Sequence, residues 1–272
     1  MVKPSAMKFD DLDARMRVFE TTSDHCVLPQ IYMVARLDGR GFTRLTKEVH
    51  RFEAPFDERF RDHMVATTEH LMTSCGFRIV YGYTQSDEIS LLFARDEDAF
   101  GRKTRKLNSV LAGEASAFFA LRLAAHAAFD CRICELPNQE LVRDYFRWRH
   151  EDAHRNALSA HAYWALRKEG KSVGQATSAL ERASVADKNE LLFQRGINFN
   201  DLPGWQKRGV GLSWKQITID AVNPKTGEAV TAVRRRLVRE LELPMRDDYD
   251  RFVLGLIDAA EGSSTTTEVA TE

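Results

Sequence analysis

Residues 77–94, FRIVYGYTQSDEISLLFA, carry the clearest structural signal in the chain. Its two halves, residues 77–84 and 89–94, are rich in aromatic and branched apolar side chains, which favour β-strands. A tight polar link, Gln85-Ser86-Asp87-Glu88, joins them. The segment therefore predicts two strands of one sheet with acidic residues where they meet.

On the N-terminal side of this segment, residues 31–37 (IYMVARL) predict a buried strand that ends at Asp38-Gly39. Residues 57–74 space Phe60, Met64 and Leu71 along one helical face, and residues 103–127, dense in Ala and Leu, predict a second helix. Residues 131–136 predict a fourth strand. The order β-α-β-β-α-β is that of a ferredoxin-like α+β fold, an antiparallel sheet with both helices on one face. The other face would then be open for a site.

The remainder of the chain divides into a helical part and a hairpin. Residues 138–195 are helical in pattern, with capping signals at Asn138 and Ser172. Residues 214–222 and 228–237 predict two strands around a turn at residues 223–227. The last residues, 262–272 (GSSTTTEVATE), are small and polar, a composition typical of disorder. The expected organisation is a first domain over residues 1–136, a helical and hairpin region over residues 137–261 packed on it, and a tail.

Composition gives no global attraction to nucleic acid, because 39 basic residues face 40 acidic ones and the net charge is −1. A nucleic-acid partner would need a local basic face, for which Arg234-Arg235-Arg236 is a candidate; a solvated strand edge explains that run equally well. No apolar run approaches the roughly 18 residues of a membrane span. The first residues also lack the apolar core of a signal peptide, so a cytoplasmic protein is expected.

The four cysteines are too few and too scattered for a disulfide scaffold. Cys131 and Cys134 form a single CxxC, whereas a structural zinc site usually needs a second pair. Their alternating pattern indicates strand residues instead.

Three acids stand at the ends of predicted central strands: Asp38 after the first, and Asp87 and Glu88 before the third. In a βαββαβ sheet these two strands are neighbours, so antiparallel pairing would bring Asp38 beside Asp87. Clustered carboxylates repel and need a cation, and Mg²⁺ is typically held by one or two carboxylates plus substrate phosphates. Two such ions about 4 Å apart can drive an in-line phosphoryl displacement. Solvated turn residues are the alternative, which is weaker for three acids at one meeting point.

Two motifs carry a family resemblance: ARLDGRGFTRLTK at residues 35–47 and YGYTQSDEISLLF at residues 81–93. They resemble the hallmark motifs of the tRNA(His) guanylyltransferase family. YFRWRHEDAH at residues 145–154 and ADKNELLF at residues 186–193 resemble later family motifs, in the same order. The resemblance spans roughly residues 31–214 and implies a nucleotidyltransferase with a polymerase-like palm, which agrees with the βαββαβ pattern.

The resemblance implies that Asp38, Asp87 and the backbone carbonyl of Gly39 bind two Mg²⁺ ions, with Glu88 as a further catalytic acid. It implies a nucleotide-binding set of Gly39, Arg40, Gly41, Phe42, Thr43, Ser86, Lys103 and Lys106, and tRNA contacts at His154, Asn156 and Lys188. Glycines allow close backbone approach to phosphate, and an arginine can add a charge-assisted hydrogen bond. The implied substrates are tRNA and nucleoside triphosphates, ATP and GTP among them, and the implied assembly is a homotetramer.

The implied reaction builds RNA from 3′ to 5′. The 5′ end of a tRNA is activated with ATP or carries a triphosphate, and the 3′-hydroxyl of an incoming nucleotide attacks it. The chain departs from the family at residues 154–160, HRNALSA, where eukaryotic guanylyltransferases have His-Ile-Asn-Asn-Leu-Tyr-Asn. This loss resembles the bacterial guanylyltransferase-like proteins. It predicts templated repair of 5′-truncated tRNA, the alternative being non-templated G(−1) addition to tRNA(His).

A second departure is Ala54, before Pro55, where relatives often have Lys. Activation by ATP is then weaker or uses another cation.

Other classes of function fit the sequence less well. Residues 150–154 spell HEDAH, a literal HExxH, but the flanking Arg147, Arg149 and Arg155 indicate an exposed charged helix rather than a buried zinc site. A catalytically silent binder on the same fold would gain nothing from clustered acids. A nucleotidyl cyclase would use the same palm. A P-loop ATPase is disfavoured. Gly170-Lys171-Ser172 matches the end of the P-loop motif, but Ala165 stands at the position of the first glycine of that motif.

Overall fold

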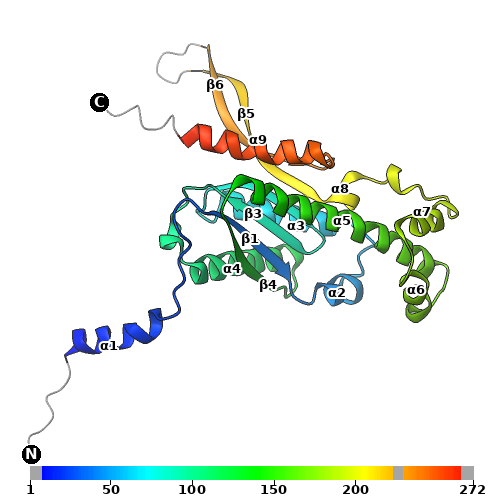
Figure 1. Cartoon of the computed structure of the whole chain (residues 1–272), viewed down its shortest axis with the longest axis horizontal. Helices are drawn as coiled ribbons and strands as arrows, with labels where there is room; N and C mark the ends of the chain where they lie inside the picture. The colour runs from blue at the N-terminus through cyan, green and yellow to red at the C-terminus, as the bar shows by residue number, and fades with distance from the viewer. Residues whose placement is uncertain (1–7, 223–228, 265–272) are drawn as a thin grey trace, which may run out of the picture.

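A six-stranded antiparallel sheet forms the centre of the protein, in the order β4-β1-β3-β2-β5-β6 (Figure 1). The computed structural model describes residues 8–222 and 229–264. The strands are β1 (Tyr32–Gly39), β2 (Ile79–Gln85), β3 (Glu88–Phe93), β4 (Phe129–Leu136), β5 (Val210–Val222) and β6 (Ala229–Glu240). The predicted β-α-β-β-α-β order and the central pairing of the first and third strands are confirmed.

Two helices, α3 (Glu58–Thr73) and α4 (Thr104–Leu123), cover one face of this sheet. Asp57 caps α3 by accepting the backbone N–H of Arg59. Side chains alternate along β1, and its odd-numbered residues Met33, Ala35 and Leu37 pack into the core on the side of these helices. Both helices were predicted within a few residues of their observed ends.

The opposite face is covered as well, contrary to the expectation that it would be open. α5 (Gln139–Lys168) and α9 (Asp247–Ser264) lie on it, and a second core joins Tyr32 and Val34 of β1 to Phe146 and Val253. The charged residues along α5 concealed its apolar stripe, so the pattern indicated a helix without indicating that it would pack on the sheet. The open face expected for the active site is therefore absent among the described residues, and the end of the sheet is where acids and a cavity meet.

Smaller elements surround this core. α6 (Val173–Leu180), α7 (Val185–Phe193) and α8 (Gly204–Arg208) contact α5. Asn138 caps α5, and Ser172 forms a capping box with Gln175, as predicted. α1 (Phe9–Thr21), which was not predicted, extends away from the body (Figure 1). The part of the chain that is described holds no helix long and apolar enough to cross a membrane.

The C-terminal hairpin continues the central sheet, because β5 pairs with β2 and β6 pairs with β5. The strands begin and end close to the predicted positions, and the predicted turn at residues 223–227 lies outside the described residues. The tail predicted from residue 262 was placed too early, because α9 continues to Ser264. Residues 265–272 of that tail lie outside the described residues. Cys131 and Cys134 are strand residues of β4, and all four cysteines are free.

Candidate active site

The three acids meet at one end of the central strand pair. Asp38 of β1 lies directly opposite Glu88 of β3 in the ladder. One residue further on, the backbone N–H of Gly39 donates to the carbonyl oxygen of Asp87 at 3.0 Å. The predicted meeting of these acids is confirmed, and it follows from the pairing of β1 with β3.

A cavity of about 510 Å³ opens beside the acids. Its floor is the end of the sheet, and its walls come from the segment after β1, the start of α3 and one face of α5. The polar and charged residues that line it are Arg36, Asp38, Thr43, Thr46, Lys47, Glu53, Asp57, Arg61, Thr84, Gln85, Ser86, Asp87, Glu88, Arg149, Asp152 and Asn156. Trp164 and Trp205 supply aromatic surface. A cavity of this size and composition can hold a nucleotide.

Asp38 and Asp87 carry charge that no basic side chain offsets. Across residues 8–222 and 229–264, neither forms an ion pair with Lys or Arg. Asp87 Oδ1 accepts a hydrogen bond from the hydroxyl of Ser86 at 3.1 Å. Burial raises the pKa of Asp87, and the nearby carboxylates of Asp38 and Glu88 raise it further. Two such carboxylates leave negative charge at this end of the sheet that a cation could offset.

The carboxylate of Glu88, unlike that of the adjacent Asp87, is paired with basic side chains. Arg149 of α5 donates to both of its carboxylate oxygens, at 2.6 and 2.7 Å, and Arg36 of β1 donates to one of them at 2.5 Å. The three side chains are only 11–20% exposed. Glu88 thus ties α5 to the sheet, and its negative charge is already neutralised by arginine.

The turn after β1 brings backbone into the cavity wall. Gly41 has φ of 72°, a left-handed conformation that glycine adopts without strain, and begins the short helix α2 (Phe42–Arg44). A Cβ at Gly39 would come within 2.5 Å of the Phe42 ring, so packing by itself requires glycine there. Phe42 itself is a core residue packed against Phe119 and Phe129, and its backbone is the part that remains available to a ligand.

Of the other predicted nucleotide-binding residues, the structure brings only some to the cavity. Thr43 and Ser86 line it. Arg40 is exposed beside it, with its backbone N–H donated to Ala128. Lys103 and Lys106 are not brought there, contrary to expectation. They lie at the start of α4, where Lys103 pairs with Asp24 at 3.1 Å. The opposite end of α4 leads into β4, whose first residue pairs with Gly39, so that end of the helix is the one near the acids. The resemblance located them along the sequence and could not give the direction of the helix.

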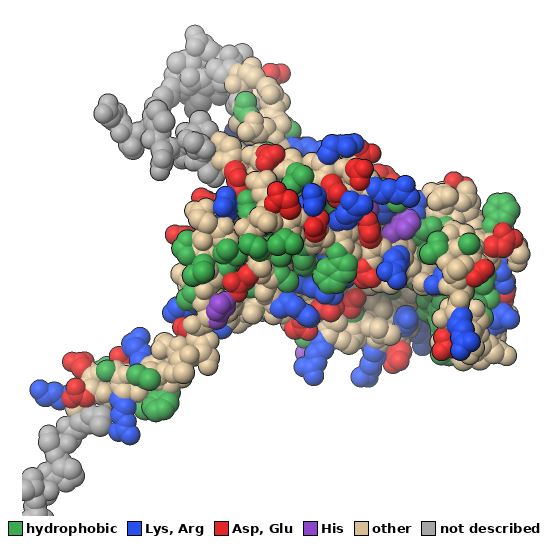
Figure 2. Space-filling model, viewed as in Figure 1, with side chains coloured by type: hydrophobic (Ala, Val, Ile, Leu, Met, Phe, Trp, Pro, Cys, Tyr) green, Lys and Arg blue, Asp and Glu red, His purple; other side chains and the backbone are tan. Residues whose placement is uncertain are grey.

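The three residues predicted to contact tRNA lie in different surroundings. Asn156 lines the cavity. The ring of His154 packs edge-on against Phe199, with centroids 5.3 Å apart, and Lys188 of α7 donates to Ser159 of α5 at 3.0 Å. These two residues hold the helical region together. Figure 2 shows acidic and basic side chains interspersed over the face in view, without the continuous basic surface that a long RNA contact would use.

The two histidines of the HExxH sequence are packed against aromatic rings and do not face a common ligand position. His150 is 2% exposed and stacks on Tyr249 with ring centroids 4.2 Å apart, and Glu151 pairs with Arg147 at 2.9 Å. Within the described ranges, neither histidine belongs to a group of possible metal ligands.

Several cavity residues were missed from the sequence. Lys47 lies in the π-helical turn η1 (Leu45–Val49), with Nζ 5.1 Å from the ring centroid of Trp164, and Arg61 lies 4.5 Å from that of Trp205. The signal that could have found part of this set is periodicity. Arg149, Ala153, Asn156, Ala160 and Trp164 recur every three or four residues on one face of α5.

Comparison with known proteins gives consistent matches along most of the chain. A family model described as tRNAHis guanylyltransferase matches residues 13–137, and one described as Thg1 C terminal domain matches residues 140–247. A probable tRNA(His) guanylyltransferase of Drosophila melanogaster is 35% identical over 79% of this chain and 77% of its own length. The tRNA(His) guanylyltransferase of Schizosaccharomyces pombe is 36% identical over 67% and 73%.

Solved structures give the same picture. A bacterial tRNA(His) guanylyltransferase-like protein in complex with GTP superposes with a TM-score of 0.70 and 26% identity, covering 91% of this chain and 99% of its own. The corresponding complex with ATP gives a TM-score of 0.71 and 25% identity, covering 90% and 98%.

Proposed function

Because the chain belongs to the tRNA(His) guanylyltransferase family of nucleotidyltransferases, we propose that it adds nucleotides to the 5′ end of tRNA at the cavity beside Asp38 and Asp87. The observation that carries this proposal is the pair of acids at the end of β1 and β3, which have no basic partner among the described residues and lie inside a cavity large enough for a nucleotide. Structures of a bacterial guanylyltransferase-like protein were solved in complex with GTP and in complex with ATP, which supports nucleotide binding here.

Asp38 and Asp87, with the carbonyl of Gly39, are the groups that would hold Mg²⁺. Their fit to the ion rests on charge: hard carboxylate oxygens are ligands that Mg²⁺ favours, and these two lack any other counter-charge among the described residues. Bound there, Mg²⁺ would neutralise developing charge on the reacting phosphate and its leaving group. Glu88 is excluded from this ligand set by its arginines, and we assign it the role of holding α5 and β3 in position.

The segment after β1 would receive the phosphates. The backbone N–H groups of Gly41, Phe42 and Thr43 have no hydrogen-bond acceptor in the part of the chain described here, and the hydroxyls of Thr43 and Ser86 face the same cavity. Donors of this kind suit phosphate oxygens.

Lys47 would supply the positive charge that relatives often place at the position of Ala54. Four basic side chains line the cavity. Arg36 and Arg149 are bound by Glu88, and Arg61 pairs with Asp62 at 2.9 Å while it stacks on Trp205. Lys47, by contrast, forms no ion pair with any described residue and rests on Trp164. It is thus the cation that can move onto a triphosphate at the lowest cost.

Templated repair is the activity that the wall of the cavity favours. At residues 157 and 160 relatives of the eukaryotic type carry Asn, and here Ala157 and Ala160 line the cavity. Their methyl groups cannot hydrogen-bond a nucleotide base. Discrimination must then come from pairing with the template strand, because only a paired nucleotide presents its 3′-hydroxyl in line with the activated 5′ phosphate.

The test compares nucleotide addition opposite C and opposite A at the −1 position. The RNA is 5′-triphosphorylated so that activation does not limit the rate, and each NTP is offered singly. We expect the complementary nucleotide to be added to 5′-truncated tRNA whatever the template base, and G to be added to full-length tRNA(His) efficiently only opposite C. Equal or better addition of G opposite A would instead support the second candidate, non-templated G(−1) addition, the activity that the names of the curated relatives suggest.

A further inference from the structure

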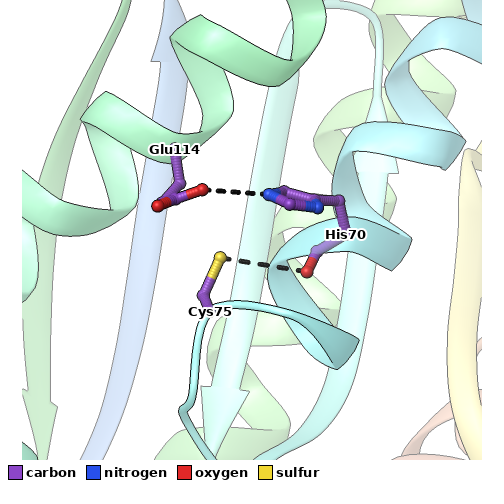
Figure 3. Close-up of side chains that lie close together, drawn as sticks. All are labelled: His70, Cys75 and Glu114. Atoms are coloured by element: carbon purple, nitrogen blue, oxygen red, sulfur yellow. Dashed lines mark hydrogen bonds and ion pairs between the residues drawn. The ribbon is translucent and has the colours of Figure 1, made fainter.

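Three side chains that could hold a metal ion lie together outside the cavity, where α3 meets α4 (Figure 3). His70 is in the last turn of α3, Cys75 follows that helix, and Glu114 is in the middle of α4. His70 Nε2 is 3.0 Å from Glu114 Oε2, and the Cys75 thiol donates to the carbonyl oxygen of His70 at 3.8 Å. One ligand atom from each of the three lies within 4.8 Å of the others.

The imidazole of His70 is held in place independently of any ion. Its ring stacks on Phe118 of α4, with centroids 4.2 Å apart and planes inclined by 9°. Glu114 and Phe118 are one helical turn apart, so the same surface of α4 orients the ring and offers it a carboxylate. A ligand whose rotamer is fixed in advance loses little entropy on binding.

The donor set favours one class of ion. Imidazole, thiolate and carboxylate together suit Zn²⁺ and related transition metals, whereas Mg²⁺ prefers oxygen ligands alone. Bonds of about 2.0–2.3 Å to Zn²⁺ place neighbouring ligand atoms roughly 3–4 Å apart in a tetrahedron. The three ligand atoms, which lie within 4.8 Å of one another, are already close to that spacing. Glu114 is 47% exposed, which leaves the site open to solvent.

We propose that His70, Cys75 and Glu114 bind one Zn²⁺ ion, with water as the fourth ligand, and that this ion fastens the end of α3 to α4. On binding, Cys75 releases its thiol proton to solvent and gives up its hydrogen bond to His70, while Glu114 exchanges its contact with the imidazole for the metal. The ion would stabilise the helical layer behind the active site and take no part in nucleotide transfer.

The site contrasts with the HExxH sequence in α5, which spells a zinc motif and does not form one. There, His150 and His154 pack against aromatic rings on different elements. Here, three residues without any sequence motif converge because α3 and α4 pack side by side.

The experiment uses Co²⁺ as a spectroscopic probe, added as the chloride to the full chain, followed by competition with Zn²⁺. We expect one equivalent of Co²⁺ to give a sulfur-to-cobalt charge-transfer absorption that Zn²⁺ removes. Cys75→Ser should abolish this absorption, and Glu114→Gln should weaken Co²⁺ binding roughly tenfold or more. Cys131→Ser is the matched control, because its thiol is also partly buried and lies on β4, away from the cluster.

Metal bound at Asp38 and Asp87 must be distinguished from metal bound at this site. The double variant Asp38→Asn, Asp87→Asn should keep the full charge-transfer absorption. Zn²⁺ should also raise the melting temperature of this variant as much as it raises that of the unaltered chain. Absence of thiolate absorption in the unaltered chain would overturn the proposal, as would absorption that survives Cys75→Ser. Circular dichroism of each variant establishes whether it is folded. If Cys75→Ser does not fold, the loss of Co²⁺ affinity in Glu114→Gln decides the test.

Discussion

Glu88→Gln and Asp87→Asn should change stability in opposite directions although the residues are adjacent. Glu88 is bound by Arg36 and Arg149 through three contacts of 2.5–2.7 Å, and these side chains are 11–20% exposed. Removing the carboxylate leaves two largely buried guanidinium groups facing one neutral amide. Breaking a buried ion pair in this way costs about 3–5 kcal/mol.

We take the lower end of this range, about 3 kcal/mol, because the glutamine oxygen still accepts one hydrogen bond and some solvent reaches the arginines. For a chain of this size, about 2–4 °C of melting temperature corresponds to each kcal/mol, so Glu88→Gln should melt about 6–12 °C lower. Asp87→Asn removes a repelling charge and should melt at the same temperature or higher. Both variants are measured in EDTA by thermal and urea unfolding.

A double-mutant cycle with Arg149→Gln isolates the contact itself. We expect the double variant to lose at least about 1 kcal/mol less than the sum of the single losses, since contacting residues typically couple by 0.5–3 kcal/mol. Additive losses, or a Glu88→Gln variant as stable as the parent, would refute the assignment of Glu88 to positioning. Its carboxylate would then be free to act with Asp38 and Asp87.

The other predictions concern the acids and Lys47. Asp38→Asn and Asp87→Asn should each abolish nucleotide addition in a single-turnover assay with triphosphorylated RNA; activity retained in either variant would contradict the metal assignment. Burial raises the pKa of Asp87, so in EDTA its ionisation should lower the stability of the parent as pH rises through that pKa, and Asp87→Asn should remove this slope. Lys47→Met should slow addition about 10- to 100-fold, the loss of one charge-assisted contact of about 1.5–3 kcal/mol, with Lys47→Arg less affected. Ala54→Lys should partly restore Lys47→Met, and an unchanged rate in Lys47→Met would remove this residue from the site.

The sequence predicted the central four strands, both helices on the α3–α4 face and the meeting of Asp38 with Asp87, because each rests on local periodicity or on one pairing rule. It could not predict that α5 covers the second face. A helix with charged residues on most of its surface still packs when a narrow apolar stripe, here with Phe146, meets the sheet.

The site was predictable only where backbone topology fixes it. The state of Glu88 depends on Arg149, which belongs to a helix whose position no local pattern determines. Lys103 illustrates the converse: a residue can match a family motif in sequence and lie at the other end of its helix from the site. The contribution of Lys47 depends on which neighbouring charges are already paired, and only the full set of contacts gives that information.

The alternation along β1 makes correct folding and an assembled active site a single event. Leu37 lies in the core beneath α3 and α4, and Asp38 points to the other face, opposite Glu88. A slip of one residue in the pairing of β1 with β3 would exchange these faces, which would place a carboxylate among apolar side chains and expose a leucine to the cavity. Such a molecule would be too unstable to accumulate. The pairing register that buries Leu37 is therefore also the one that places Asp38 at the cavity, so a stably folded molecule with these two residues exchanged is not expected.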